Sequence, residues 1–462
     1  MRKFIKIHTA IIIILSSFSL VFGQSHKPFF KDGDTICFLG DSITHGGQYH
    51  EFLQLFYATR YPEVTLSFHN CGISGDNASG MLARFEEDVL KHKPTHVFLM
   101  TGMNDVNRNL YFDGTASDKL LNQRAAALKN YKKQTALLVA KIKAYQVVPI
   151  LLTPTIYDQY SKIEKEKNMG CNDALIACSN HIKKLGDKYD ALVIDLNTPM
   201  KELMERELKK DSLFTVIGKD RVHPGPMGNF IMFNQIIATL EPEATLSKIA
   251  IDLHNDQHLI LAEHATLRNV QLSDSLISFQ AHENSLPFPV GNYLGKALSL
   301  TSFTDIYNRQ LFQVEGLKDG AYKLFIENVF IGRFSSQELG TGVNLAKKAN
   351  TPQYKKAKAI RELCAAYRKT EFQLRTVAHI KYTFLNDYKG KNDVALVKKH
   401  LDRKLKKIDG KPFYGYIKNS MDTYFEILPK VDSLEKKIER IKTLMQLENR
   451  TSPHEWVLST TL

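Results

Sequence analysis

Between residues 33 and 242, short runs of apolar residues alternate with longer segments whose apolar positions recur every three or four residues. The short runs are continuously apolar, which is typical of strands buried on both faces. We expect strands over residues 35–39, 65–68, 96–100, 148–152 and 192–195. We expect helices over residues 81–91, 118–145, 172–189 and 198–210. Strands separated by helices indicate parallel pairing, so the pattern predicts a three-layer α/β/α domain.

The hydrophobic pattern changes after this domain. Residues 247–340 contain short alternating runs with turn residues, which predict a small β-rich unit. Expected strands include residues 259–261, 276–280 and 297–301. A glycine-containing loop over residues 316–320 separates the runs 311–314 and 322–327, which predicts a hairpin. Residues 341–462 show helical periodicity over 353–382 and 431–447, so we predict a helical C-terminal region.

Positive charge is concentrated in the C-terminal region. The chain has 62 Lys/Arg and 49 Asp/Glu, and residues 341–462 hold 26 and 13 of them, which accounts for the whole net charge of +13. Such helices can contact an anionic glycan or an acidic membrane surface, or form a solvated basic face. The apolar fraction of 43% and the charged fraction of 24% are those of a soluble globular protein rather than a disordered or membrane chain.

The N-terminus has the composition of an export signal. Arg2, Lys3 and Lys6 precede an apolar run over residues 10–22 that ends at the small residue Gly23. This order predicts a signal peptide over residues 1–23 and a secreted or periplasmic protein. The apolar run is shorter than the roughly 20 residues that span a bilayer, which argues against a membrane anchor. For an exported protein, nucleic acid is not an expected partner.

The five cysteines lack the spacing of a zinc site, and we expect them to be buried free thiols. No metal site is predicted, and no cofactor is expected.

Two segments carry candidate catalytic groups. Ser42 lies in the segment 40–44, which directly follows the expected strand over 35–39. Its hydroxyl can face the site edge of a parallel sheet there, although a serine in this place can also simply cap a helix. Asp220 and His223 are spaced so that in a tight turn the carboxylate can bond one imidazole nitrogen and leave the other free. Alone, that pair can equally be a structural hydrogen bond. The G-x-S-x-G elbow of α/β-hydrolases is absent around Ser42.

Two further segments follow the neighbouring expected strands. Gly75 allows its backbone N–H to approach a ligand closely, and Asn104 can donate from its side-chain amide. Individually, each is more often a turn residue. Because parallel strands send their carboxyl ends to one edge, we expect these loops to meet Ser42 and His223 there.

The segments G-D-S-I-T (40–44), G-I-S-G-D-N-A (72–78), G-M-N-D (102–105) and D-R-V-H (220–223) resemble the four blocks of the SGNH/GDSL hydrolase family. The resemblance covers residues 33–240. It implies that Ser42 is the nucleophile, that His223 is the general base and that Asp220 orients it. It also implies an oxyanion hole formed by the backbone N–H groups of Ser42 and Gly75 and the amide of Asn104.

The resemblance leaves the substrate open, because the family includes lipases, thioesterases, lysophospholipases and carbohydrate deacetylases. The export signal and the added β-rich unit favour an O-acyl ester on a carbohydrate, and within that class an O-acetyl ester. A lipid-directed esterase, or a glycan-binding or assembly role for the C-terminal region, remain alternatives. His45 and Tyr157 are candidate substrate contacts because they lie near the nucleophile and after the fourth strand, although surface or packing roles are equally open.

Overall fold

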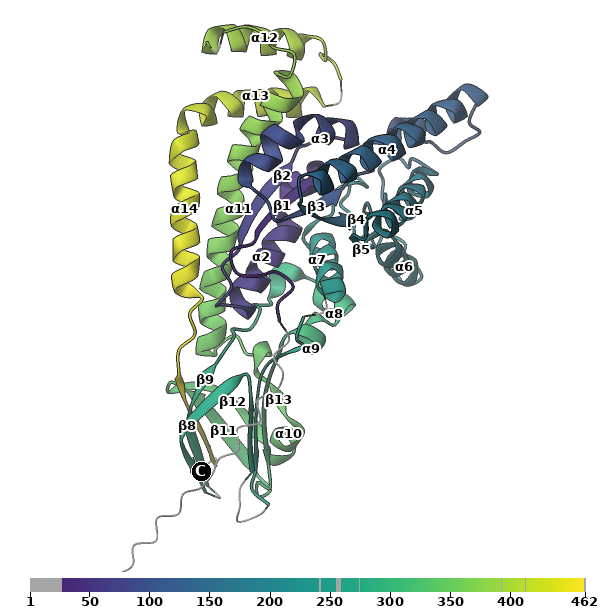
Figure 1. Cartoon of the computed structure of the whole chain (residues 1–462). Coiled ribbons are helices and arrows are strands. Elements are labelled where there is room, and N and C mark those ends of the chain that lie inside the picture. Colours follow the sequence, from purple (N-terminus) through teal and green to yellow (C-terminus); the bar gives the residue numbers. More distant parts are fainter. Residues whose placement is uncertain are drawn as a thin grey trace, which may run out of the picture.

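The computed structural model describes residues 27–240, 242–254, 259–273, 275–391, 393–411 and 413–460 (Figure 1). The predicted signal peptide over residues 1–23 lies outside the described residues. A five-stranded parallel sheet forms the centre of the first domain, in the order β2-β1-β3-β4-β5. Its strands are β1 (Thr35–Gly40), β2 (Ser67–Gly72), β3 (His96–Met100), β4 (Val148–Leu152) and β5 (Leu192–Ile194).

Helices cover both faces of this sheet. One face packs against α2 (Gln48–Arg60), α6 (Asn197–Leu208) and α7 (Pro226–Leu240), and the other against α3 (Ala78–Arg84), α4 (Asp118–Ala144) and the second half of α5 (Cys171–Tyr189). Alternate residues of β1 face opposite ways, so Phe38 joins the first core and Leu39 the second. The predicted three-layer α/β/α domain is therefore confirmed.

The strand order reverses at β1, which lies between β2 and β3. The register places Gly40 beside Gly72 and Leu39 beside Leu99, so the carboxyl ends of the three strands are adjacent. Ligand sites of open parallel sheets lie at such a reversal, because the loops there diverge and leave a crevice. The loops with Ser42, Gly75 and Asn104 all start at this point.

The β-rich unit consists of two sheets with a common core (Figure 1). The first has the order β13 (Val343–Asn344), β10 (Arg309–Glu315), β6 (Thr245–Asp252) and β7 (Leu259–Glu263). The second has the order β12 (Val329–Ser335), β11 (Ala321–Ile326), β14 (His454–Thr460), β9 (Leu276–Glu283) and β8 (Ala265–Leu272). Between residues 297 and 341 there are also three short helices, α8 (Ala297–Thr301), α9 (Phe303–Tyr307) and α10 (Ser336–Thr341).

Three local predictions in this part differ from the structure. The hairpin predicted around residues 316–320 is wrong, because β10 and β11 belong to different sheets and the loop crosses between them. The strand predicted over 297–301 is wrong too: this segment is α8, whose Ala297 is buried in the core shared with α7. Finally, β14 lies in the region expected to be helical, and its Trp456 and Leu458 are buried in the β-unit core.

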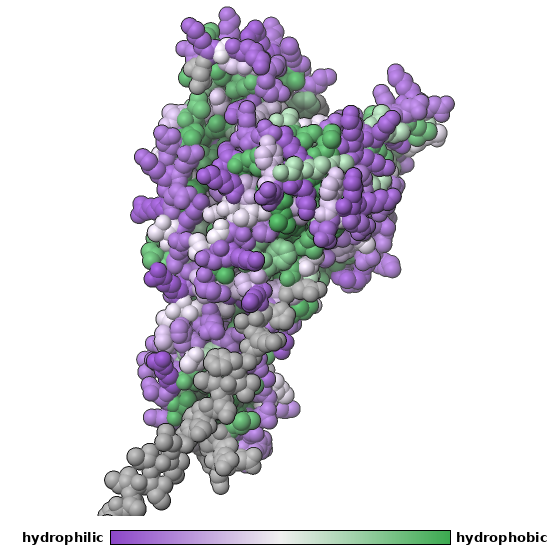
Figure 2. Space-filling view, viewed as in Figure 1, coloured by the Kyte–Doolittle hydropathy of each residue, from purple (hydrophilic) through white to green (hydrophobic). Residues whose placement is uncertain are grey.

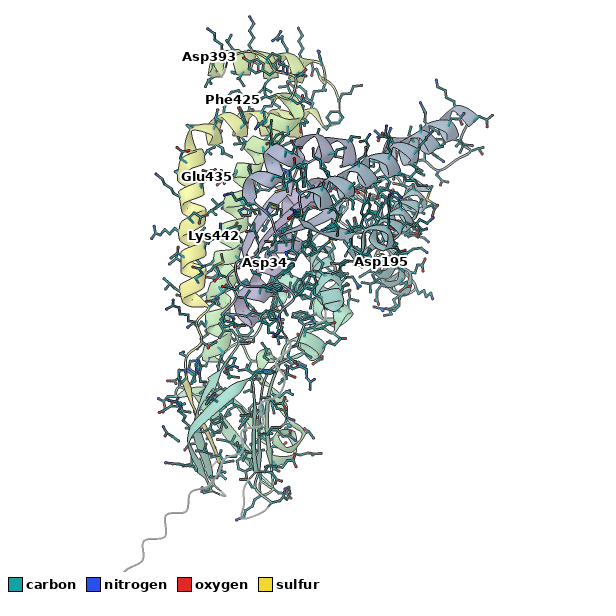
Figure 3. The ribbon with its side chains drawn as sticks, viewed as in Figure 1. Asp34, Asp195, Asp393, Phe425, Glu435 and Lys442 are labelled. Carbon is teal, nitrogen blue, oxygen red and sulfur yellow. The ribbon has the colours of Figure 1, made fainter. Side chains whose placement is uncertain are left out.

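The helical C-terminal region runs along the side of the first domain (Figure 1). It contains α11 (Pro352–Phe384), α12 (Val394–Lys406), α13 (Tyr414–Ile427) and α14 (Val431–Glu448), which confirms the predicted helices. Apolar residues of α11 and α14 belong to the same core as α2 and α7, whereas α12 and α13 share a small separate cluster with the end of α11. Hydrophilic residues dominate the face in Figure 2, and Figure 3 places Glu435 and Lys442 on α14 and Asp393 before α12.

All five cysteines are buried and free, as expected. Within the described ranges, no helix combines the length and the apolar character required to cross a bilayer.

Candidate active site

Ser42 is the first residue of α1 (Ser42–Gly46), the short helix that follows β1. Asp41 caps this helix, since its carboxylate accepts the N–H of Ile43 at 2.9 Å. Burial raises the pKa of Asp41 to about 6. The Ser42 N–H lies in the first turn, where helix geometry leaves the N–H groups without intrahelical acceptors. The serine therefore offers a hydroxyl and a backbone donor at the same edge of the sheet.

The structure brings Ser42, His223 and Asp220 into one hydrogen-bonded chain. The Nε2 atom of His223 lies 2.7 Å from the Ser42 Oγ atom, and its Nδ1 atom lies 2.5 Å from Asp220 Oδ2. Partial burial acts to raise the pKa of Asp220, but the hydrogen bonds from His223 and Val222 outweigh it and lower this pKa. The ionised carboxylate holds the proton on Nδ1, which leaves Nε2 to accept the serine proton.

A tight turn builds the Asp220–His223 pair. The Gly218 N–H donates to the His223 carbonyl at 2.7 Å, and Arg221 has a positive φ of 68°. As a result, Asp220 and His223 are exposed while Arg221 is buried between them. The Arg221 guanidinium donates to the carbonyl oxygens of Asp158, Ser161, Ile163 and Lys165. These hydrogen bonds tie the turn that carries Asp220 and His223 to the loop after β4.

The loops with Gly75 and Asn104 follow β2 and β3, which lie on either side of β1. Gly75 has a φ of +79°, a conformation that glycine adopts without strain. Arg108 donates to the Asn104 Oδ1 atom at 2.9 Å and so fixes the orientation of the amide. The Nδ2 atom donates one hydrogen to the Asp76 carbonyl at 2.8 Å, and an amide nitrogen carries a second.

The two candidate substrate contacts lie in the protein interior. His45 is buried, its Nδ1 atom is 2.9 Å from Ser74 Oγ, and its ring packs on Phe372 of α11. Tyr157 is also buried, and its hydroxyl donates to Asn168 Oδ1 at 2.7 Å. The contacts made by both side chains tie loops together.

Sequence reasoning missed the arginines that support these groups. Arg221 stands inside the D-R-V-H segment and Arg108 four residues after Asn104, yet nothing in the spacing shows that these guanidinium groups bind loop carbonyls. Such a role depends on which loops fold around the arginine.

Comparisons with known proteins agree with this geometry. Residues 38–229 match the GDSL-like lipase/acylhydrolase family. An acetylxylan esterase of Geobacillus stearothermophilus is 25% identical over 215 residues, which cover 43% of this chain and 90% of the relative. The structure of a gut microbial diltiazem-metabolizing enzyme superposes with a TM-score of 0.84 and 25% identity, over 95% of this chain and 100% of that one.

The first match covers less than half of this chain, whereas the second covers nearly all of it. The family match, the parallel sheet and the four loop segments lead to the same assignment. Residues 38–229 form a GDSL-like hydrolase domain, and the chain is a serine hydrolase that acts on ester bonds.

Proposed function

We propose that this chain is an exported esterase that removes O-acetyl groups from a carbohydrate through an acyl-enzyme. The observation that carries the catalytic part is the chain of hydrogen bonds from Ser42 through His223 to Asp220. Ester cleavage by a covalent route needs an activated hydroxyl, an oriented base and donors for the oxyanion. In this proposal, Ser42, Gly75 and Asn104 supply these donors.

In the first half-reaction, the Ser42 Oγ atom attacks the acyl carbon while His223 Nε2 takes the serine proton. The carbonyl oxygen becomes an oxyanion, which the Ser42 and Gly75 N–H groups and the Asn104 amide stabilise. His223 then gives its proton to the leaving sugar oxygen, and the acetyl group stays on Ser42. In the second half-reaction, His223 deprotonates a water that attacks the acetyl-enzyme, which releases acetate and restores the serine.

Two considerations support a carbohydrate acetate as the substrate. One relative is named as an acetylxylan esterase, and the predicted signal peptide would send this chain to where polysaccharides occur. The other relative, which shares the added β unit and helices, is described as a diltiazem-metabolizing enzyme. The substrate screen should therefore include acetate esters of small aromatic molecules as well as acetylated glycans.

The test is acetate release from acetylated xylan and xylo-oligosaccharides by the wild-type chain and by Ser42→Ala. We expect release by the wild type alone. Acetyl and octanoyl esters of p-nitrophenol separate the proposal from a lipid-directed esterase, because the proposal predicts faster acetyl turnover. Equal or faster octanoyl turnover would favour the lipid alternative, and full activity of Ser42→Ala would remove the nucleophile assignment.

A second role is favoured by the surface of α12. Lys399, Arg403 and Lys406 are exposed on this helix, line a shallow hollow, and make no ion pair with any residue that the structure describes. We propose that this face contacts anionic glycans. Retention of the full chain on an immobilised anionic polysaccharide should fall with added salt. Replacing the three cations by glutamine should abolish it, and no retention of the wild type at low salt would refute the role.

A further inference from the structure

The side chains of α11 occupy the free edge of the central sheet. β2 is an edge strand in the described sheet, so one row of its backbone N–H and C=O groups faces away from β1. Three α11 side chains, spaced four residues apart, bond to alternate residues of this row. The bonds are Tyr367 Oη to Phe68 O at 2.5 Å, Asn70 N to Glu371 Oε1 at 2.7 Å and Arg375 Nε to Gly72 O at 3.2 Å.

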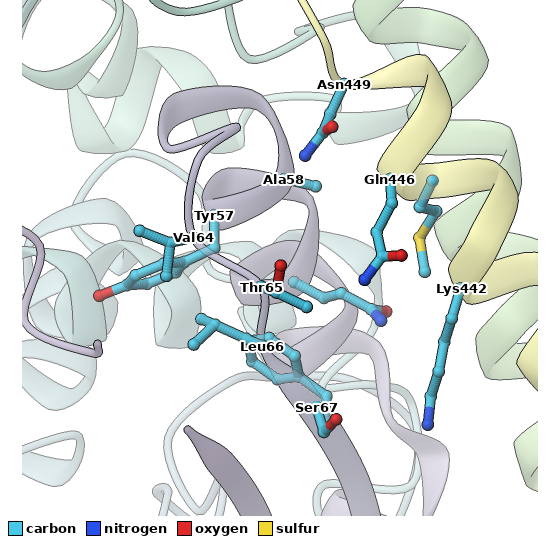
Figure 4. A pocket seen from close by; sticks show the side chains of 12 residues that line it. Tyr57, Ala58, Val64, Thr65, Leu66, Ser67, Lys442, Gln446 and Asn449 are labelled. Carbon is cyan, nitrogen blue, oxygen red and sulfur yellow. The ribbon is translucent and has the colours of Figure 1, made fainter. Parts of the chain in front are cut away.

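The spacing explains why the two elements match. Four residues of an α-helix rise about 6.0 Å, and two residues of a strand advance about 6.6 Å. Successive α11 side chains thus stay in step with β2, and the helix takes the place of a further strand. α14 approaches this side of the domain less closely, since a cavity of about 80 Å³ separates its Lys442 and Gln446 from the loop before β2 (Figure 4).

The last of the three side chains continues into a buried network of charges. The Nη1 and Nη2 atoms of Arg375 lie 2.7 and 2.8 Å from the two oxygens of Asp88, a bidentate pair. Asp88 lies on a π-helical turn (Phe85–Val89) that extends α3, and Arg84 also bonds to its carboxylate. The Arg84 Nε atom then bonds to the Asp76 carboxylate at 2.8 Å. The side chains of Arg375, Asp88 and Arg84 are at most 5% exposed, so solvent screens these pairs little.

Both ends of this network meet the catalytic loops. Asp76 follows Gly75 directly, and its carbonyl oxygen accepts the Asn104 amide at 2.8 Å. At the other end, Arg375 holds the carbonyl of Gly72. A Cβ atom at Gly72 would lie 2.2 Å from the His45 backbone nitrogen, so this residue packs directly against the helix that begins at Ser42.

We propose that Arg375 is a positioning residue for the oxyanion hole. Through Asp88 and Arg84 it fixes Asp76, and with it the Gly75 N–H and the Asn104 amide, while its bond to Gly72 supports the nucleophile helix. The proposal rests on the proposed function of Ser42 and its oxyanion donors. It assigns to the C-terminal helical region a part in catalysis, which α11 plays through the groups that it positions on other elements.

The test is the rate at which a fluorophosphonate labels the serine, because the phosphonyl oxygen occupies the oxyanion hole and no natural substrate is needed. Arg375→Gln should slow labelling about tenfold, the cost of roughly 1.4 kcal/mol of lost oxyanion stabilisation. The matched control is Arg361→Gln, which removes an arginine from the same helix that stacks on Tyr293 instead. We expect the control to label at the wild-type rate.

A double-mutant cycle separates positioning from general stability. If Arg375 acts through the oxyanion hole, Arg375→Gln should slow labelling of Asn104→Ala by a smaller factor than it slows labelling of the wild type, because one of the donors that it positions is already lost. If the factors by which the two substitutions slow labelling simply multiply, the proposal is overturned. A wild-type labelling rate for folded Arg375→Gln would also overturn it.

If Arg375→Gln does not fold, Arg375→Lys answers the same question. It keeps the charge near Asp88 but loses the bidentate geometry and the bond to Gly72. We expect it to label more slowly than the wild type, and an unchanged rate would overturn the proposal. Normal labelling without acetate release from glycans would instead show that only the proposed substrate is wrong.

Discussion

The exchange of one carboxylate oxygen for an amide nitrogen at residue 220 should stop catalysis by reversing the histidine tautomer. In the structure, Asp220 Oδ1 accepts the backbone N–H groups of Val222 and His223 at 3.0 and 2.9 Å, and Oδ2 faces His223 Nδ1. In Asp220→Asn the two backbone donors require the amide oxygen, which turns the NH₂ group toward Nδ1. Nδ1 must then accept a hydrogen bond, so the imidazole proton moves to Nε2. A protonated Nε2 atom cannot accept the serine proton.

The magnitude follows from what is lost. Loss of the correct tautomer in such a triad lowers kcat by about 10⁴-fold, which corresponds to about 5.5 kcal/mol of transition-state stabilisation. KM should change little, because the Asp220 side chain points to the histidine rather than to the substrate. Asp220→Ala is the matched comparison, since it removes the carboxylate but lets the imidazole adopt either tautomer.

The assay is p-nitrophenyl acetate hydrolysis at neutral pH, with circular dichroism to verify the fold. We expect Asp220→Asn to be at least as slow as Asp220→Ala. An asparagine variant with near wild-type kcat, or one clearly faster than the alanine variant, would refute the tautomer reasoning.

Three further predictions test other parts of the account. Asn104→Ala should lower kcat by about 10²- to 10³-fold with little change in KM, and p-nitrophenyl acetate kinetics check it; a change confined to KM would contradict an oxyanion role. Burial raises the pKa of Glu371 to about 8, above its ordinary 4.5, so the native state binds this proton more tightly and stability falls as pH rises through this range. In urea unfolding, the free energy of unfolding of Glu371→Gln should therefore rise relative to that of the wild type between pH 5 and pH 8, by on the order of 4 kcal/mol. If the free energies of the two proteins change in parallel with pH, burial does not raise this pKa. Arg221→Gln should lower the free energy of unfolding by about 3 kcal/mol and reduce kcat, because loop carbonyls lose a charged donor. The control variant Lys219→Gln, at an exposed neighbouring residue, should do neither. Equal effects of the two substitutions in thermal melts would show that the Arg221 hydrogen bonds do not stabilise these loops.

The sequence could predict the α/β/α domain because its signals are local. Continuous apolar strands and amphipathic helices alternate in the order in which they occur along the chain, and parallel pairing follows from that order. The β unit was harder to predict. β14 pairs with β9 and β11, from which it is separated by the whole helical region, and no local pattern specifies such a partner. The loop after β10 carries turn residues that suit a hairpin and a crossing between sheets equally well.

The same distinction holds for the site. The sequence could predict that Ser42, Asp220 and His223 meet, because short motifs with fixed spacing build the turn after β1 and the turn that carries Asp220 and His223. The supporting arginines have no such motif. Arg375 lies some 300 residues from Gly72 in the sequence, and its role exists only because α11 docks on the sheet edge. Its spacing from Tyr367 and Glu371 was visible in the sequence, but that spacing indicates only a shared helix face.

Covalent labelling by a fluorophosphonate shows whether Ser42 is the nucleophile of a serine hydrolase, because this reagent forms a bond with the activated serine. We predict that peptide mapping by mass spectrometry will find the adduct on Ser42, formed in step with the loss of esterase activity and absent from Ser42→Ala. Labelling of a different residue together with loss of activity, or an esterase that stays fully active after Ser42 has been modified, would show that Ser42 is not the nucleophile.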